Sequence, residues 1–188
     1  MLIACDGSSL KNGDPKSPSG WAWARDDGAW MSNGMIGGSN NRAELHALWS
    51  VLAFHRTGEL TIQMDSQYAL NIAEKWAFGW EKRGWVKADK QPIQNLDIVQ
   101  AITLLRHRRK DPIIFEWVKG HGKGAVLSPL NEAADLRAGE AARRAREAGE
   151  DSKDMFYLDS KGRLTTPHET HIFKKLYANR PNLVIAHK

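Results

Sequence analysis

The chain has 188 residues, of which 41% are hydrophobic and 26% charged, as expected for one globular domain, and its net charge of +5 is compatible with a polyanionic partner. Its one cysteine excludes an intramolecular disulfide and favours a reducing compartment. No stretch approaches the roughly 18 apolar residues of a membrane span, and a first strand that begins at Met1 or Leu2 leaves no room for a signal peptide, so we expect a cytoplasmic protein without a membrane segment.

Hydrophobic periodicity and turn signals predict that strands alternate with helices after an opening run of strands. The first half of the chain is expected to contain strands at residues 2–6, 21–24, 29–31 and 35–36, a helix at 44–55, a strand at 60–64 and a helix at 66–76. An irregular basic stretch at 80–90 follows, and then a helix from Pro92 to the basic residues 106–110. We expect a strand at 113–118, a loop at 120–129 and a helix at 130–148 after it. This order predicts an α/β fold in which helices pack against a mixed sheet.

The composition changes near residue 149, where we place a boundary. Residues 1–149 are expected to form the main domain, and residues 150–188 a C-terminal extension of unknown role, either folded back on the domain or partly disordered. Residues 156–158 and 163–165 flank a polar turn in the manner of a hairpin. A short helix and a short strand are also expected at residues 171–177 and 183–185.

Four acidic residues stand where a lone carboxylate would be costly. Asp6 and Asp65 each end an apolar strand, and Glu44 and Asp135 lie near the starts of two helices. Several buried carboxylates that converge on one point repel each other unless divalent cations lie between them. A shared site of this kind is what the metal-assisted cleavage of a phosphodiester requires.

Each of these acids also has an ordinary structural explanation when it is considered alone. Asp6 suits a turn, and Asp65 suits a helix cap. Glu44 matches a capping box with Asn41, and Asp135 suits the dipole at a helix N-terminus. The metal hypothesis therefore depends on the four acids occurring together in a specific context.

That context is a set of seven short fragments in a fixed order. They are Asp6-Gly7-Ser8, Asn40-Asn41-Arg42-Ala43-Glu44-Leu45, Met64-Asp65-Ser66-Gln67-Tyr68, Trp80-Glu81-Lys82-Arg83-Gly84-Trp85, Ala88-Asp89-Lys90, Trp117-Val118-Lys119-Gly120-His121 and Asn131-Glu132-x-x-Asp135. From about residue 2 to residue 148 the chain closely resembles type 1 ribonuclease H of the bacterial ribonuclease HI kind. The resemblance implies a ribonuclease H-like fold, with a five-stranded mixed β-sheet flanked by α-helices, and makes residues 1–149 the catalytic domain.

The resemblance also implies an activity and a catalytic site. The activity is endonucleolytic hydrolysis of the RNA strand of RNA–DNA hybrids, which leaves 5′-phosphate and 3′-hydroxyl ends. By position, Asp6, Glu44, Asp65 and Asp135 match the ligands of two Mg²⁺ or Mn²⁺ ions, about 4 Å apart. His121 matches the family's loop histidine, implied to move protons or aid product release, although alone it suits an exposed loop. The loop at 123–129 is longer than is usual in the family.

The substrate surface is likewise implied by position. Asparagine and glutamine side chains match contacts with the minor groove of the hybrid, and Ser39, Asn40 and Arg42 match a pocket for a DNA phosphate. Residues 75–90 carry five basic and two acidic side chains with interleaved tryptophans, which resembles the family's basic protrusion. The structural alternative is that the tryptophans are buried and the charges merely solvated, which we favour for Trp80 and Trp85. The implied substrate-binding residues are Asn12, Ser39, Asn40, Asn41, Arg42, Gln67, Trp76, Lys82, Arg83 and Lys87.

Two other functions compete with an active nuclease. The first is a non-catalytic module that binds RNA–DNA hybrids, and the presence of all four acids argues against it. The second is the core of a related polynucleotidyl transferase, against which the basic protrusion and Asn40-Asn41-Arg42 argue. We therefore expect a monomeric enzyme whose partner is an RNA–DNA hybrid.

Overall fold

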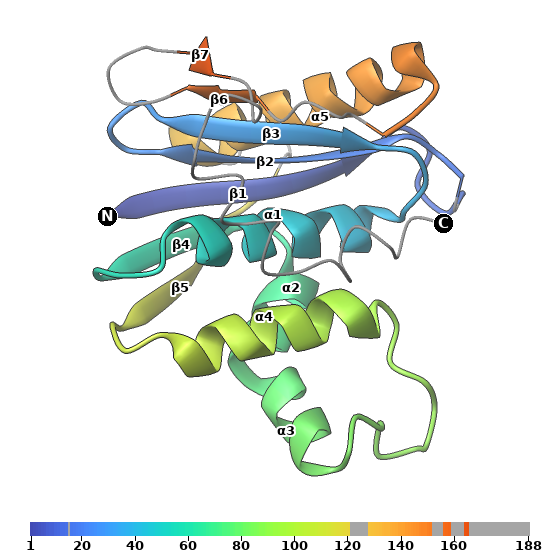
Figure 1. The fold of residues 1–188 in the computed structure, drawn as a ribbon, viewed down its shortest axis with the longest axis vertical. Coiled ribbons are helices and arrows are strands. Elements are labelled where there is room, and N and C mark those ends of the chain that lie inside the picture. The colour runs from blue at the N-terminus through green and yellow to red at the C-terminus, as the bar shows by residue number, and fades with distance from the viewer. Residues whose placement is uncertain (15, 121–127, 152–155, 159–163, 166–188) are drawn as a thin grey trace.

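The computed structural model describes residues 1–14, 16–120, 128–151, 156–158 and 164–165 (Figure 1). His121 and the elements expected at 171–177 and 183–185 lie outside these residues. Among the described helices, none combines the length and the apolar character that crossing a membrane requires.

One sheet runs through the molecule, with the strand order β5-β4-β1-β2-β3-β6-β7. Its strands are β1 (Leu2–Ser9), β2 (Ser19–Arg25), β3 (Trp30–Met35), β4 (Leu60–Met64), β5 (Ile113–Trp117), β6 (Phe156–Leu158) and β7 (Leu164–Thr165). β1 pairs antiparallel with β2 and parallel with β4, and β4 pairs parallel with β5, so the sheet is mixed as predicted. The strands predicted within the main domain are all present, but the two expected at 29–31 and 35–36 form the single strand β3, and β1 extends three residues beyond its expected end.

The extension contributes the last two strands of the sheet. β6 pairs antiparallel with the free edge of β3, where Trp30 lies opposite Leu158, and β7 pairs antiparallel with β6. The hairpin predicted from residues 156–158 and 163–165 is therefore present and lies against the main domain (Figure 1).

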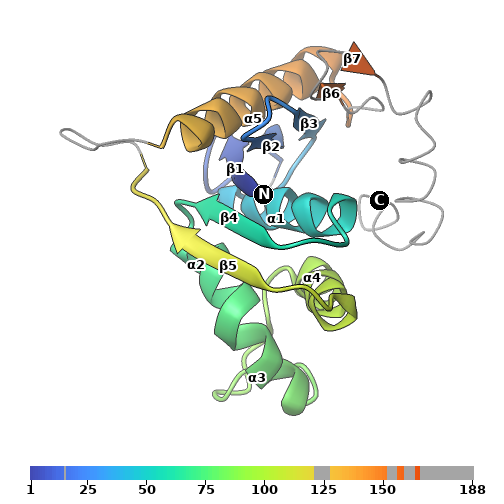
Figure 2. The same cartoon turned by 90° about the vertical axis from the view of Figure 1, so that its left-hand side faces the viewer.

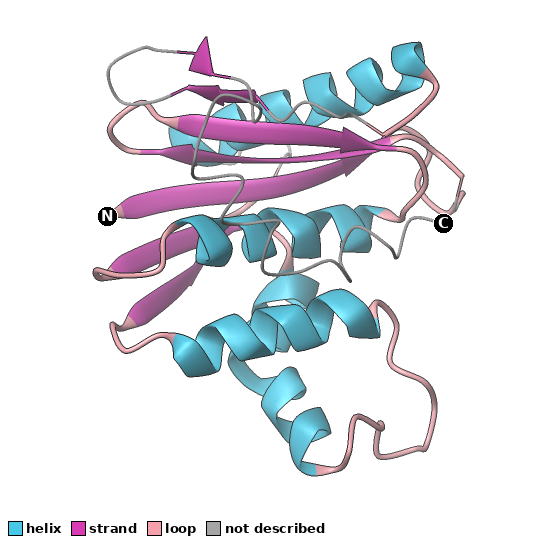
Figure 3. Cartoon of the chain, in the orientation of Figure 1, coloured by secondary structure: helices cyan, strands magenta, loops and turns pink. Residues whose placement is uncertain are grey.

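Helices cover both faces of the sheet (Figure 3). α1 (Asn40–Phe54) lies against one face and α5 (Pro129–Ala148) against the other, over β1, β2 and β3 (Figure 2). The buried face of α5 is made almost entirely of alanines, which lets the helix lie close to the strands. The remaining helical elements are α2 (Gln67–Asn71), the π-helical turn η1 (Ile72–Trp76), α3 (Ala77–Lys82) and α4 (Leu96–Arg108).

Three helix boundaries differ from the predictions. α1 begins four residues before Glu44, because Ser39 is its N-cap and accepts a hydrogen bond from the backbone N–H of Arg42 at 3.3 Å. The capping box proposed for Glu44 is therefore wrong. Residues 80–82 are helical rather than irregular, and Pro92 does not open a helix, since α4 begins only at Leu96.

Candidate active site

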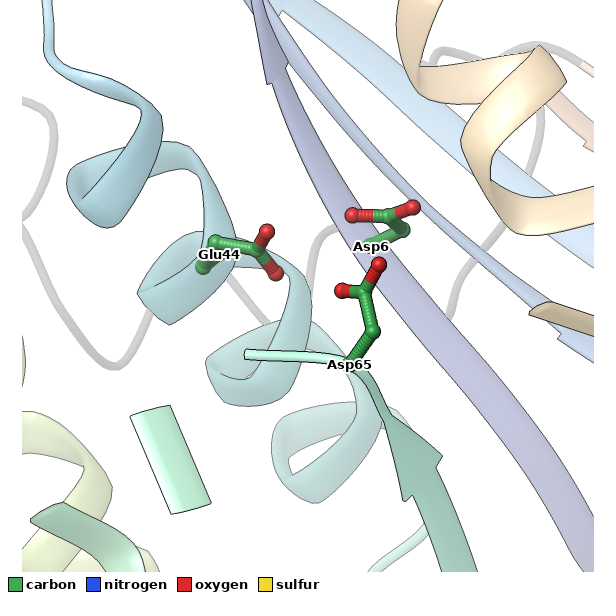
Figure 4. Close-up of side chains that lie close together, drawn as sticks. All are labelled: Asp6, Glu44 and Asp65. Carbon is green, nitrogen blue, oxygen red and sulfur yellow. The ribbon is translucent and has the colours of Figure 1, made fainter. Parts of the chain in front are cut away.

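Three of the four predicted acids converge in the structure. Asp6, Glu44 and Asp65 each offer a carboxylate oxygen, and these oxygens all lie within 4.8 Å of one another. Figure 4 shows the three carboxyl groups pointing toward a common space from β1, from α1 and from the end of β4. Asp135, on α5, lines the same pocket, together with Ser8, Asn40 and Ser66. The structure thus brings all four predicted acids to one place.

The sheet register explains why the two aspartates meet. β1 and β4 are neighbouring parallel strands, and Ala4 lies opposite Gln63. Asp6 and Asp65 each follow two residues later, so both stand at the same edge of the sheet. Equivalent positions on adjacent strands place side chains of one face within reach of each other.

A glycine brings α1 close enough for Glu44 to join the aspartates. A Cβ atom at Gly7 would lie 2.2 Å from the backbone nitrogen of Glu44, so no side chain fits between β1 and this turn of α1. Glu44 lies in the second turn of the helix, on its buried face. The signal for this contact in the sequence was the Gly7 that directly follows Asp6.

The cluster is electrostatically strained without a cation. Asp6 and Glu44 are only 4% and 3% exposed. Burial, reinforced by the charge of Asp65, raises the pKa of Asp6 to about 7. Burial and the charges of Asp6 and Asp65 likewise raise the pKa of Glu44 well above its usual value.

The donor set fits a hard divalent cation. Glu44 Oε1 accepts a weak hydrogen bond from Asn40 Nδ2 at 3.4 Å, whereas its buried Oε2 has no hydrogen-bond partner among the described residues. A buried carboxylate oxygen without a partner is costly. Carboxylate oxygens are the ligands that Mg²⁺ and Mn²⁺ prefer, so a cation here would satisfy this oxygen and offset the repulsion.

Comparison with known proteins identifies the family. The model of the RNase H family matches residues 1–143. The chain belongs to the RNase H family. It is therefore a hydrolase that cleaves the RNA strand of RNA–DNA hybrids, as the sequence predicted.

Relatives and solved structures agree with this family membership. The chain is 41% identical to ribonuclease H of Tropheryma whipplei over 144 residues, which cover 76% of this chain and 84% of the relative. It is 38% identical to ribonuclease H of Rhizobium etli over 141 residues, which cover 72% and 85%. The fold is similar to that of LC9-RNase H1, a type 1 RNase H with the type 2 active-site motif, with a TM-score of 0.62 and 22% identity over 100% of this chain and 85% of that one. It is also similar to the N-terminal RNase H domain of rv2228c from Mycobacterium tuberculosis, with a TM-score of 0.55 and 21% identity over 79% of this chain and 96% of that one.

In this RNase H, the last residue of β5 and the short segment after it pack against Asp65. The indole Nε1 of Trp117 donates a hydrogen bond to the main-chain oxygen of Asp65 at 3.1 Å. A Cβ atom at Gly120 would lie 2.3 Å from Asp65 Oδ2, so any other residue here would require the carboxyl group of Asp65 to move. His121 follows Gly120 directly in the sequence.

The predicted phosphate pocket contains an ion pair that the sequence did not reveal. Ser39 is the N-cap of α1, and Asn40 lies in the acidic pocket. Arg42, however, donates from Nη1 and Nη2 to the two carboxylate oxygens of Asp97, at 2.9 and 2.7 Å. Arg42 and Asp97 are 55 residues apart on two helices, and no local pattern links them.

The other predicted substrate residues lie on the surface. Asn12 is exposed in the turn after β1, Asn41 is exposed in the first turn of α1, and Gln67 is exposed at the start of α2. Gln67 follows Ser66, which lines the acidic pocket.

The basic protrusion, residues 75–90, comprises the end of η1, α3 and the first part of the loop that follows, and α3 extends away from the sheet (Figure 1). Lys82 and Arg83 are exposed at the end of α3, and Lys87 is partly exposed in the loop. Trp76 is 41% exposed, whereas Trp80 and Trp85 pack against the core, as the sequence favoured. Trp76 is therefore accessible to a partner, whereas Trp80 and Trp85 contribute to packing.

Proposed function

We propose that this RNase H cleaves its substrate with two divalent metal ions, Mg²⁺ by preference, held by Asp6, Glu44, Asp65 and Asp135. The observation that carries the proposal is the convergence of these acids from four different segments, with a buried oxygen of Glu44 that has no hydrogen-bond partner in the described part of the chain. When bound, the two ions would activate the attacking water and stabilise the leaving 3′ oxygen, which leaves a 5′-phosphate and a 3′-hydroxyl.

The sheet and the helix packed on it would hold the carboxylates of Asp6 and Glu44 in fixed positions. Asp6 lies within the sheet and accepts a hydrogen bond from the backbone N–H of Gly7 at 2.7 Å, which fixes the direction of its carboxyl group. Glu44 is buried on a helix that packs against the same strand. His121, which follows the segment packed on Asp65, would carry a proton to or from the reacting groups or aid product release.

We further propose that the substrate lies across the pocket with its minor groove facing Asn12, Asn40, Asn41 and Gln67. Amide groups both donate and accept, which suits 2′-hydroxyls and base edges in a wide, shallow groove. Ser39 and Arg42 would hold a DNA phosphate at the N-terminus of α1, where backbone N–H groups also favour an anion. Lys82, Arg83, Lys87 and Trp76 would bind the backbone from the protrusion.

A non-catalytic binding module fits the site less well. A polyanion approaches a cluster of buried carboxylates only when cations lie between them. A module that bound hybrids without cutting them would gain nothing from such a cluster. We also propose that the enzyme is a monomer in the cytoplasm, where a reducing environment suits the buried thiol of Cys5.

The test compares three labelled duplexes of the same sequence: RNA–DNA hybrid, double-stranded DNA and double-stranded RNA. We expect cleavage of the RNA strand of the hybrid alone, dependent on Mg²⁺, with 5′-phosphate ends that a phosphatase can remove. Cleavage that survives EDTA, or products with a 3′-phosphate, would contradict the mechanism.

A further inference from the structure

Two of the four acids reach the pocket from elements that scarcely touch each other. Asp135 lies on α5, which packs over β1, β2 and β3 and only slightly against β4. Asp65 directly follows β4. The sheet links these two carboxylates only indirectly, through β1, so a direct contact between the two segments would fix their distance more closely.

A chain of side-chain hydrogen bonds joins the N-terminus of α5 to β4 and β5. The hydroxyl of Ser128 donates to Gln63 Oε1 at 2.6 Å, and Gln63 Nε2 donates to Glu116 Oε2 on β5 at 3.1 Å. The carboxylate of Glu116 accepts from the NH₂ group of the amide, which turns the amide oxygen toward Ser128. The orientation of Gln63 is thus determined by both of its partners.

The two ends of this chain are adjacent to the acids. Gln63 lies on β4, two residues before Asp65, which directly follows the strand. Ser128 is the N-cap of α5, where its oxygen accepts from the backbone N–H of Asn131 at 3.4 Å, two turns before Asp135. Figure 2 shows the first turn of α5 on the same side of the molecule as the C-terminal ends of β4 and β5. A shift of this turn would move Asp135 relative to Asp65.

We propose that Gln63 is a positioning residue, which ties the first turn of α5 to β4 and so sets the separation of Asp65 and Asp135. This inference rests on the proposed two-metal function, because the separation of Asp65 and Asp135 matters for cleavage only if both carboxylates hold the ions. Side chains that orient metal ligands typically influence metal affinity or activity by about 10- to 100-fold when they are removed. Gln63 bonds to the N-cap of the helix that carries Asp135 rather than to a ligand itself, so we expect an effect at the lower end of this range.

The experiment measures Mg²⁺ dependence in Gln63→Leu, which removes both hydrogen bonds and retains the size of the side chain. The matched control is Gln100→Leu, the same chemical change at an exposed position of α4. Two quantities are recorded for each protein: the Mg²⁺ concentration that gives half-maximal cleavage of a hybrid, with kcat and KM, and the rise in melting temperature that Mg²⁺ causes without substrate. Ser128→Ala and Ser128→Thr form a second pair, in which only threonine keeps the hydroxyl.

We expect Gln63→Leu to need roughly tenfold more Mg²⁺ and to lose kcat with little change in KM for the hybrid, and to show a smaller Mg²⁺-induced rise in melting temperature. Ser128→Ala should behave like Gln63→Leu. Ser128→Thr and Gln100→Leu should behave like the parent. If the parent cleaves the hybrid and Gln63→Leu matches it in both quantities, the positioning role is overturned and the proposed function stands. If the parent does not cleave with Mg²⁺ and Gln63→Leu still weakens the thermal response to the ion, the positioning role stands and the proposed function fails.

Discussion

Asp6 shows how a single residue is adapted to a metal at the expense of stability. Its carboxyl group is buried beside two others, and its pKa is raised to about 7 because burial and Asp65 both disfavour the charged form. The unfolded chain has no such penalty, since an exposed aspartate titrates near 4. Between these two values the folded protein retains a proton that the unfolded chain has released.

This difference predicts a pH dependence of metal binding. Mg²⁺ requires the charged carboxylate, so as the pH falls below about 7 the ion must displace a proton, and its affinity should decrease. We expect Mg²⁺ to bind severalfold more weakly at pH 6 than at pH 8 and to release protons on binding. Calorimetric titration in two buffers of different ionisation enthalpy measures both. Equal affinity at the two pH values, with no proton release, would contradict the assignment of Asp6.

The sequence predicted which acids meet, but not every neighbour that holds them. Asp6 and Asp65 each end an apolar run of the sequence, and their convergence follows once β1 and β4 are placed side by side. The pair of Arg42 with Asp97 and the packing of Gly120 on Asp65 depend on tertiary contacts between distant segments, for which no local pattern exists. The role of Glu44 was ambiguous in the sequence because a capping box has the same spacing, and the N-cap at Ser39 removes that alternative.

At the scale of elements, His55 joins the end of α1 to β2. Its Nδ1 contacts the main-chain oxygen of Val51 at 3.0 Å, and its Nε2 contacts Arg25 Nη1 at 3.1 Å. A carbonyl only accepts and a guanidinium only donates, so the ring is neutral with its proton on Nδ1. Burial lowers the pKa of His55 to about 4. The hydrogen bond to the Val51 oxygen acts to raise this pKa, and the charge of Arg25 lowers it further.

A histidine that is neutral in the folded state predicts acid sensitivity. Its pKa in the unfolded chain is about 6.5, so between pH 6.5 and 4 the unfolded chain binds a proton that the folded protein excludes. The free energy of unfolding should therefore fall as the pH is lowered through this window, by about 2 to 3 kcal/mol from this residue. Denaturant titrations of the parent and His55→Gln at pH 7 and pH 4.5 test this. An equal loss of stability in both proteins would exclude His55 as the cause.

The helix at 96–108 shows why some boundaries escaped prediction. Proline is common at the first position of a helix, which is why Pro92 was expected to start one. Instead, Ile93 is buried and anchors the loop that precedes α4 to the core. The helix begins only after Asn95, which adopts a left-handed conformation with φ of 55°. Periodicity predicted the body of the helix, because that signal is local, whereas the start depends on how the loop packs.

At the scale of the whole molecule, the extension lengthens the sheet that carries the site. β6 covers the edge of β3, and Asp151 accepts a hydrogen bond from the backbone N–H of Ile36 at 2.5 Å. Ile36 lies shortly before the N-cap of α1, so the start of the extension is tied to the segment that leads into the acidic pocket. Strands of two or three residues carry too little pattern to fix their partner from sequence alone.

Removal of the extension should therefore cost stability more than activity. We expect a chain of residues 1–149 to cleave hybrids with a kcat within a few fold of the parent, since all four acids are retained, but to melt several degrees lower because the edge of β3 loses its partner. Circular dichroism melting and steady-state kinetics provide the two measurements. A truncated chain that remains folded and does not cleave would make the extension part of the active centre.

The measurement that tests the central claim most directly is metal-dependent cleavage by Asp65→Asn. The substitution retains the shape of the side chain and removes one of the charges that would hold the ions. We expect its kcat on a labelled hybrid to fall by a factor of about 10³ or more, while its affinity for the hybrid stays close to that of the parent. Cleavage by Asp65→Asn at the parent's rate and Mg²⁺ requirement would show that the converging carboxylates are not the catalytic centre.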